Sequence, residues 1–242
     1  MKEKNVVRLD KFLANSGFSS RRSVRKFLKE NVLTVNGVEV RDPEMKVAPE
    51  KDSLVLNGEE IREERFVYYV LNKPKNVIST TSDELGREDV TAFIETGRTI
   101  YPIGRLDKDT AGLILLTDDG ELTHQLTHPR YHVEKVYRLT IDGTVSDEQL
   151  ETLRTGVALK DGKTLPAKVK VISSDKGQTM LELGIIEGRN RQIRRMCWKL
   201  EINLLELKRI AFGPINLGEL TEGEYRELGE KEIEALREIV KK

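Results

Sequence analysis

The sequence has few of the residues from which many structural and catalytic sites are built. Its 242 residues include one cysteine, Cys197, and three histidines. A single cysteine excludes an internal disulfide and indicates a reducing compartment, so we expect a cytoplasmic protein. There is no apolar run long enough for a membrane-spanning helix. The phosphate-binding patterns Gly-x-x-x-x-Gly-Lys-Ser/Thr and Gly-x-Gly-x-x-Gly do not occur, which removes the main support for a nucleotide hydrolase or a dinucleotide enzyme.

The net charge is zero, but the charges are unevenly distributed. Residues 1–41 hold ten Lys or Arg and four Asp or Glu, whereas the rest of the chain holds 31 basic and 37 acidic residues. Such a basic arm indicates a nucleic-acid partner. An ordinary solvated surface is the alternative, although such surfaces usually mix both signs. The cations that we expect to contact phosphates in this arm are Arg8, Lys11, Arg21, Arg22, Arg25 and Lys29.

Residues 1–60 are expected to form a small domain of two helices followed by a sheet. Leu9, Phe12 and Leu13 fit one face of a short first helix, and residues 21–30 form the second. Alternating apolar residues on both sides of Asn36-Gly37 predict a hairpin, because a type I′ turn needs two residues with positive φ. A further strand is expected over residues 53–56.

Residues 61–242 are expected to form a second domain, reached through the charged segment of residues 59–65. Residues 66–71 predict a buried strand, and more strands are expected over residues 112–117, 136–141, 167–173 and 179–186. Helices are expected over residues 89–95, 121–126, 146–155, 190–200 and 231–240. Because strands and helices mix irregularly, we predict an α+β fold with a mixed, largely antiparallel sheet.

Two patterns that could suggest chemistry have simpler interpretations. His124, His128 and His132 are spaced by four, as on a metal-binding helix face, but Pro129 would interrupt that helix. A surface or nucleic-acid contact is favoured, so no metal site is predicted. Cys197 lies in an apparent helix beside Met196, where a cysteine usually packs as a small apolar residue.

Two polar segments are harder to explain as scaffold. Residues 104–110 place two carboxylates and two cations directly before an apolar strand, and catalytic side chains commonly lie on such loops. Residues 187–196 hold four arginines within seven positions, which suits binding of phosphates or of a carboxylate. The second domain is therefore expected to have a cleft lined by an aspartate and several arginines.

Five motifs in order resemble the RsuA family of ribosomal RNA pseudouridine synthases. They are Asn72-Lys73-Pro74, Gly104 to Leu113, His128 to Tyr137, Glu187 to Met196, and Gly223 to Leu228. Residues 8 to about 50 also resemble the alpha-L RNA-binding domain of many members. Two positions depart from the family pattern: Asn76 replaces a usual Gly, and Gly229 replaces a usual Ser or Thr helix cap. Asn tolerates positive φ and Gly is an acceptable cap, so both local structures are expected to survive.

The resemblance implies the catalytic roles. Asp107 matches the aspartate that breaks the glycosidic bond, either by attacking the nucleoside or by removing a ribose proton. Arg194 matches the arginine that pairs with this aspartate, and Tyr137 matches the tyrosine that packs on the target base. Arg105 matches a residue that fills the space left by the flipped base. Because isomerisation adds and removes nothing, no cofactor is implied.

The partner that the resemblance implies is ribosomal RNA or a ribosome-assembly intermediate, bound by a monomer without membrane contact. Arg189, Arg191 and Arg195 are expected to bind RNA together with Arg105 and the N-terminal cations. Motif details favour the large-subunit RNA slightly over the small-subunit RNA. The rival hypothesis is an RNA-binding assembly factor that kept the fold without the activity.

Overall fold

The computed structural model describes residues 6–19, 23–61, 66–80, 88–175 and 177–241. The chain divides into two compact units. One comprises Met1–Val67 with the short segments Thr96–Ile100 and Thr117–Gly120, and the other comprises Tyr68–Glu95, Tyr101–Leu116 and Glu121–Lys242. Among the described residues, no helix combines the length and apolarity needed to cross a lipid bilayer.

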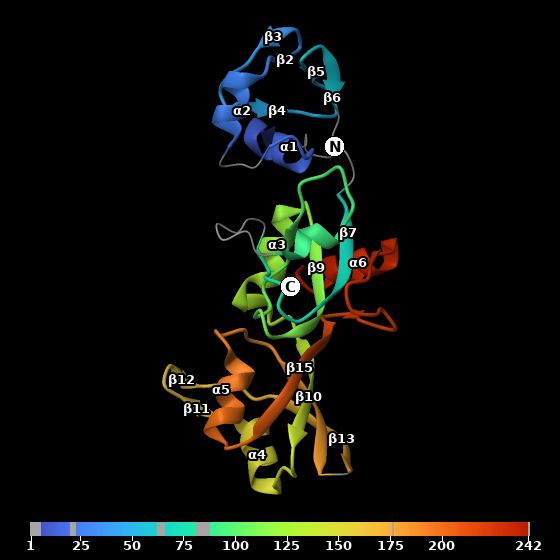
Figure 1. The fold of residues 1–242 in the computed structure, drawn as a ribbon. Helices are drawn as coiled ribbons and strands as arrows, with labels where there is room; N and C mark the ends of the chain where they lie inside the picture. Colours follow the sequence, from blue (N-terminus) through green and yellow to red (C-terminus); the bar gives the residue numbers. More distant parts are fainter. Residues whose placement is uncertain (1–5, 20–22, 62–65, 81–87, 176, 242) are drawn as a thin grey trace. The chain divides into compact units, whose positions relative to one another are not determined.

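The N-terminal unit has two helices and small sheets, as the sequence predicts. Helices α1 (Leu9–Asn15) and α2 (Val24–Glu30) pack beside a four-stranded antiparallel sheet of order β3-β2-β5-β6 (Figure 1). Its strands are β2 (Leu33–Val35), β3 (Val38–Glu39), β5 (Leu54–Leu56) and β6 (Glu59–Ile61), and β1 (Val7–Arg8) pairs separately with β4 (Lys46–Val47). Leu9, Phe12 and Leu13 are all buried in its core.

Both hairpins of this unit turn at an Asn-Gly pair. Asn36 and Gly37 have φ values of 52° and 82°, so the predicted hairpin is confirmed. Asn57 and Gly58 form a second such turn, with φ values of 51° and 94°. The segment expected as a linker therefore begins as strand β6, and the predicted domain boundary after residue 60 falls inside that strand.

The second unit is built on a nine-stranded mixed sheet. Its order is β13-β14-β10-β15-β9-β7-β17, with β16 and β8 added at β15 and β9. The pairings of β10 with β14 and β15 are antiparallel, whereas β15 and β9 run parallel. The strands are β7 (Tyr68–Lys73), β8 (Tyr101–Pro102), β9 (Ala111–Thr117), β10 (Lys135–Asp142), β13 (Lys168–Asp175), β14 (Gln178–Ile185), β15 (Asn203–Phe212), β16 (Ile215–Asn216) and β17 (Tyr225–Glu227). The predicted α+β class with a largely antiparallel sheet is confirmed.

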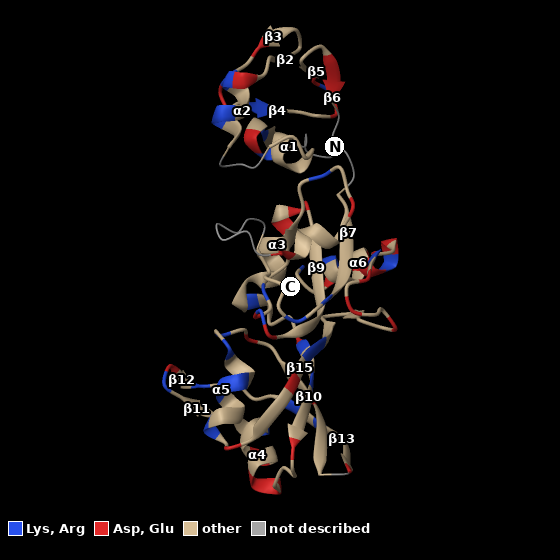
Figure 2. Cartoon of the chain, viewed as in Figure 1, with Lys and Arg blue, Asp and Glu red and all other residues tan. Residues whose placement is uncertain are grey.

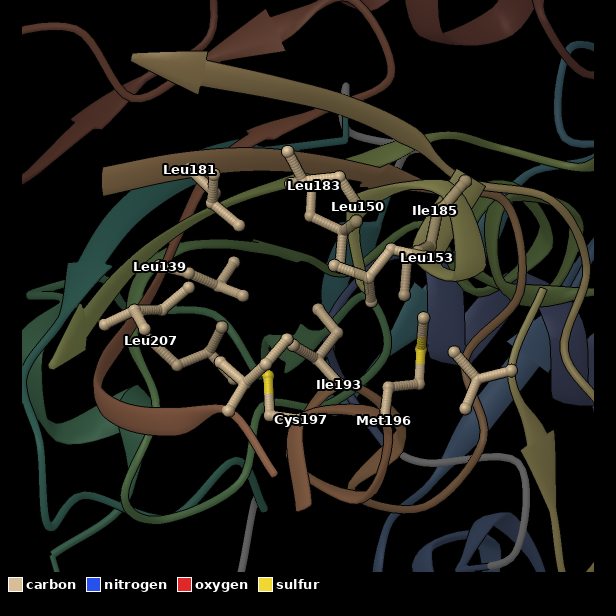
Figure 3. Packing of buried hydrophobic residues seen from close by; sticks show 14 residues of the cluster. Leu139, Leu150, Leu153, Leu181, Leu183, Ile185, Ile193, Met196, Cys197 and Leu207 are labelled. Atoms are coloured by element: carbon tan, nitrogen blue, oxygen red, sulfur yellow. The ribbon is translucent and has the colours of Figure 1, made fainter. Parts of the chain in front are cut away.

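Helices α4 (Asp147–Thr155) and α5 (Gln192–Lys199) cover one face of this sheet. Leu150 and Leu153 of α4 and Met196 of α5 pack against leucines of β10, β14 and β15, as Figure 3 shows. Burying this apolar face fixes α5 against the sheet, and the segment that leads into α5 is thereby fixed as well. The small hairpin of β11 (Ala158–Leu159) and β12 (Gly162–Lys163) lies between α4 and β13 in the chain.

Some predicted elements differ in the structure. The helix expected over residues 89–95 is one 3₁₀ turn, η1 (Val90–Phe93), whose start is capped by the Asp89 carboxylate accepting from the Thr91 amide. The long strand β15 was not predicted. The other expected helices agree within two residues with α3 (Gly120–Thr127), α4, α5 and α6 (Glu230–Glu238). A short 3₁₀ turn, η2 (Pro129–Tyr131), follows α3.

The two departures from the family pattern keep their local structures. Asn76 has φ 71°, as the turn requires. Gly229 precedes α6, and its backbone N–H donates to the Glu232 carboxylate at 3.0 Å.

Candidate active site

A cavity of about 520 Å³ lies in the second unit, where the two predicted polar segments meet. Its walls come from residues 78–80, the loop of residues 104–110 and residues 188–194, together with Tyr137 and the two apolar side chains of Ile185 and Leu207. Figure 2 shows basic and acidic residues mixed along the segments that line it. The structure therefore brings together the aspartate loop and the arginine segment, which lie some 80 residues apart in the chain.

Backbone hydrogen bonds hold the aspartate loop in one conformation. The Ser79 hydroxyl accepts from the Leu106 amide at 3.1 Å and contacts the Leu106 carbonyl at 3.0 Å. The Thr110 amide donates to the Asp107 carbonyl at 3.0 Å, and the Asn76 amide donates to the Lys108 carbonyl at 2.7 Å. The Asp107 side chain, 31% exposed, is thus presented to the cavity by a backbone that has little freedom to move.

Gly112, just after this loop, allows the close approach of two strands. Its φ is 105°, and a Cβ atom there would lie 2.2 Å from the Arg209 carbonyl oxygen of β15. No other residue fits this position without moving backbone. Gly112 therefore allows the parallel contact of β9 and β15 close in sequence to Thr110 and Leu207, which line the cavity.

Two arginines hold the loop through Asp109 rather than Asp107. Arg191 donates from both terminal nitrogens to the Asp109 carboxylate, at 3.0 and 3.1 Å, and its Nη1 is 4.0 Å from Asp107 Oδ2. Arg194 lies 3.2 Å from the same Asp109 carboxylate and donates to the Asp109 carbonyl at 2.9 Å. The expected Arg194–Asp107 pair is therefore replaced by an Arg194–Asp109 pair, and Arg191 is the arginine closest to Asp107. The hydrogen bond from Arg191 lowers the pKa of Asp109 below its usual value.

The remaining two arginines of the segment contact the β11–β12 hairpin. Arg189 lines the cavity, but its guanidinium donates to the carbonyls of Asp161, Gly162 and Lys163 and to the Glu187 carboxylate. Arg195 makes a bidentate pair with the Asp161 carboxylate, at 2.9 and 3.0 Å. Arg195 therefore joins α5 to this hairpin, and Arg189 joins the segment before α5 to it; their predicted role in RNA binding stays a prediction.

Tyr137 lines the cavity from strand β10, and a buried arginine lies beside it. Arg209, 2% exposed, is paired with Tyr137 in the sheet register and interacts with it electrostatically. Its Nε donates to the Leu113 carbonyl at 2.6 Å. Burial lowers the pKa of Arg209, and the contact with Tyr137 opposes that shift. Sequence reasoning missed Arg209, because Glu206 and Lys208 precede it and nothing in the local sequence marks it as the buried charge.

Lys73 was also missed as a site residue, although its motif was recognised. It is fully buried, and its ammonium donates to the carbonyls of Pro74 and Val77 at 2.8 Å and of Lys108 at 3.4 Å. Burial lowers its pKa to about 8, and the charges of Asp109 and Asp107 oppose that shift. Lys73 therefore ties strand β7 to the backbone of the aspartate loop.

The other predicted residues fall in different places. Arg105 is exposed at the rim of the cavity. Arg8 donates to the carboxylates of Asp10 and Glu44 in the N-terminal unit, which also holds Lys11, Arg25 and Lys29. Arg21 and Arg22 lie outside the described residues.

The histidines and the cysteine add no chemistry to the site. The rings of His124 and His128 meet edge to face with centroids 5.5 Å apart. Within the described residues, no three His, Cys, Asp or Glu side chains are grouped to hold a metal ion. Cys197 points from α5 into the buried core, and burial raises the pKa of its thiol to about 12.

Known proteins resemble this chain along nearly its whole length. The profile described as RNA pseudouridylate synthase matches residues 67–199, and the S4 domain profile matches residues 7–52. Ribosomal large subunit pseudouridine synthase B of Bacillus subtilis (strain 168) is 42% identical over 237 residues, which cover 97% of each chain. An uncharacterized RNA pseudouridine synthase of Aquifex aeolicus (strain VF5) is 36% identical over 97% of this chain and 95% of its own. A crystal structure of a pseudouridylate synthase matches with a TM-score of 0.67 and 32% identity, over 95% of this chain and 99% of that one.

The family profile over more than half of the chain, the S4 match before it and the similar pseudouridine synthases show an RNA-modifying enzyme of the isomerase class. The chain belongs to the RNA pseudouridylate synthase family, and within it to the RsuA-like members with an N-terminal S4 domain. The family, the fold and the class of reaction expected from the sequence are confirmed. The roles of individual site residues stay predictions.

Proposed function

We propose that the protein isomerises one uridine of large-subunit ribosomal RNA to pseudouridine, with Asp107 as the essential carboxylate. The observation that carries this proposal is the position of Asp107, which lines the same cavity as Tyr137 and lies 4.0 Å from Arg191. The large subunit is chosen because the relative from Bacillus subtilis carries that substrate in its name.

In the reaction that we propose, the chain's own residues bind, orient and exchange protons with one nucleotide. A flipped uridine enters the cavity, with Arg105 at the rim beside the gap it leaves. Asp107 breaks the bond between ribose and N1 of uracil, either by attack on the nucleoside or by removing a ribose proton. Tyr137 packs on the freed base while it turns, and C5 then bonds to the ribose and loses its proton. Arg191 and Arg194 keep the aspartate loop in place through Asp109.

We further propose a division of labour along the chain. Residues 1–60 dock the RNA through phosphate contacts, and residues 61–242 carry out the reaction. The enzyme acts as a monomer in the cytoplasm, on free ribosomal RNA or on an assembly intermediate. The S4 match over residues 7–52 supports the docking role.

The test is release of tritium from ribosomal RNA labelled at uridine C5, with small- and large-subunit transcripts assayed separately. The Asp107→Asn variant should release no tritium above background yet bind RNA with nearly unchanged affinity. Asp161→Asn is the matched control, because this carboxylate also pairs with arginines but does not line the cavity.

The possible results of this assay distinguish the proposed function from its alternatives. Release that requires Asp107 from the large-subunit transcript alone supports the whole proposal, and release from the small-subunit transcript alone overturns the substrate. A normal rate in Asp107→Asn would overturn the catalytic assignment. No release from either transcript or from assembly intermediates would favour the rival function, an RNA-binding assembly factor.

A further inference from the structure

The most exposed large apolar side chain in the described part of the chain lies on the helix that follows the cavity. Trp198, near the end of α5, is 78% exposed and is the only tryptophan of the protein. Tryptophan is usually well buried, because removing its large ring from water is favourable. Ile193, Met196 and Cys197 of the same helix are all buried in the core. Trp198 is therefore exposed to water, which is unfavourable for its large apolar ring, although three other residues of the same helix are buried in the core.

The helix geometry places Trp198 on the same face as Arg194, which lines the cavity. Residues three and four apart are neighbours on a helix surface, so Trp198 adjoins Arg194 and Arg195. Arg194 lines the cavity, and Trp198 follows it by four residues, or about 6 Å of rise along the axis. The indole thus lies about one helical turn beyond the wall of the proposed active site.

Three positively charged residues are neighbours of Trp198 along this helix. Arg194, Arg195 and Lys199 flank it, and Figure 2 shows basic residues along α5 and the segment before it. Lys199 is exposed and makes no hydrogen bond or ion pair with the residues that the structure describes. A surface that docks a protein is expected to be a contiguous apolar patch, with lysine depleted. A single aromatic ring among cations is instead the arrangement with which proteins hold unpaired nucleotides, by stacking on a base and pairing with phosphates.

We propose that Trp198 is a stacking site for an unpaired base of the RNA, next to the nucleotide that enters the cavity. Lys199, whose charge is unpaired among the described residues, contacts a phosphate beside that base. This inference rests on the proposed function, since it adds a second nucleotide-binding position to the same RNA site. Such a position keeps the strand that flanks the target uridine in an open, unpaired form.

The fluorescence of the lone tryptophan tests the contact directly. Titration with a single-stranded oligouridylate should quench the emission of Trp198 and protect it from acrylamide. An abasic ribose-phosphate oligomer of the same length and charge should produce little of either change, because it offers no base to stack. Equal quenching by the two oligomers, or none by oligouridylate at concentrations that saturate binding, would overturn the proposal.

Kinetics on the ribosomal RNA transcript give a second readout. Trp198→Leu keeps an apolar side chain but cannot stack, so KM should rise about tenfold with kcat unchanged, whereas Trp198→Phe should keep most of the affinity. Ile172→Ala, which alters another exposed apolar residue on edge strand β13, serves as the control and should leave KM unchanged.

The outcomes separate this proposal from the function on which it rests. Normal isomerisation with an unchanged KM in Trp198→Leu overturns the stacking site alone. A blue shift of the emission with protein concentration, without RNA, would assign Trp198 to contact between copies and overturn it also. Wild-type protein that neither binds nor modifies RNA overturns both proposals.

Discussion

The two units of the protein use positive charge in different ways. On α2 of the N-terminal unit, Arg25 and Lys29 are exposed and have no hydrogen-bond or ion-pair partner among the described residues. In the second unit, every arginine from Arg189 to Arg195 is bonded to a carboxylate, and some also to backbone carbonyls. Unpaired cations act through long-range attraction that salt screens, whereas paired guanidinium groups fix the geometry of what they hold. We therefore expect the exposed cations of α2 to attract RNA to the enzyme, and the paired arginines of residues 189–195 to fix the shape of the active site.

Of the variants that we propose, the removal of an arginine that fixes the active site should lower kcat the most. Arg194→Ala deletes the contacts with the Asp109 carboxylate, the Asp109 carbonyl and Thr110. We expect kcat to fall about a hundredfold, because a small displacement of a catalytic group costs that much, while RNA affinity changes little. Steady-state tritium release at saturating RNA gives kcat, and filter binding gives the affinity. Arg195→Ala is the matched control, since it loses the pair with Asp161 outside the cavity and should keep kcat within a few-fold.

The opposite result for Arg194→Ala would contradict this assignment. If Arg194→Ala weakened RNA binding and left kcat intact, Arg194 would belong with the attracting cations. The contrast drawn between the two units would then fail.

The buried Lys73 should have an intermediate effect on catalysis and a distinct effect on stability. Lys73→Met removes three hydrogen bonds to carbonyls, including that of Lys108 in the aspartate loop, so kcat should fall about tenfold. Because the pKa of Lys73 is lowered to about 8 from 10.5, the unfolded chain binds more protons than the native one between these values. The stability of the wild type relative to Lys73→Met should therefore rise with pH across this window and be constant below it.

Urea unfolding of both proteins at a series of pH values measures this difference. Lys135→Met is the matched control, because burial also lowers the pKa of Lys135 to about 8, yet this residue bonds to no part of the loop. It should show a similar pH dependence with normal kcat. A flat stability difference for Lys73→Met would mean that its ammonium remains charged when buried.

Local patterns predicted much of the fold. Asn36-Gly37 specified a hairpin because few other residues adopt its backbone angles, and the apolar face of residues 9–13 specified α1. Strand β15 was missed because its register against β10 shifts between Thr140 and Ile141, so burial alternates only from Leu207 onward. A bulge of this kind depends on the partner strand, which the local sequence does not contain.

The sequence predicted which segments form the site, but it did not predict which carboxylate each arginine contacts. The aspartate loop and the arginine segment were both identified, yet Arg194 was assigned to Asp107 and contacts Asp109 instead. Two carboxylates two residues apart offer the same chemistry to a guanidinium. The choice between them depends on loop angles and on where α5 begins, and both are set by packing between distant segments.

Removing the exposed cations of α2 should have the smallest effect on the reaction, because it should change only RNA affinity. Arg25→Gln combined with Lys29→Gln removes two exposed, unpartnered charges from α2, so RNA affinity should fall only a few-fold at moderate salt. The slope of log affinity against log salt should become shallower by about 1.4 to 1.8, as expected for two lost phosphate contacts. The kcat at saturating RNA should not change. Arg41→Gln is the control, because Arg41 is already paired with Glu39 in the same unit. An unchanged salt slope would mean that α2 does not contact the RNA, and a lower kcat would show that the N-terminal unit also affects the active site.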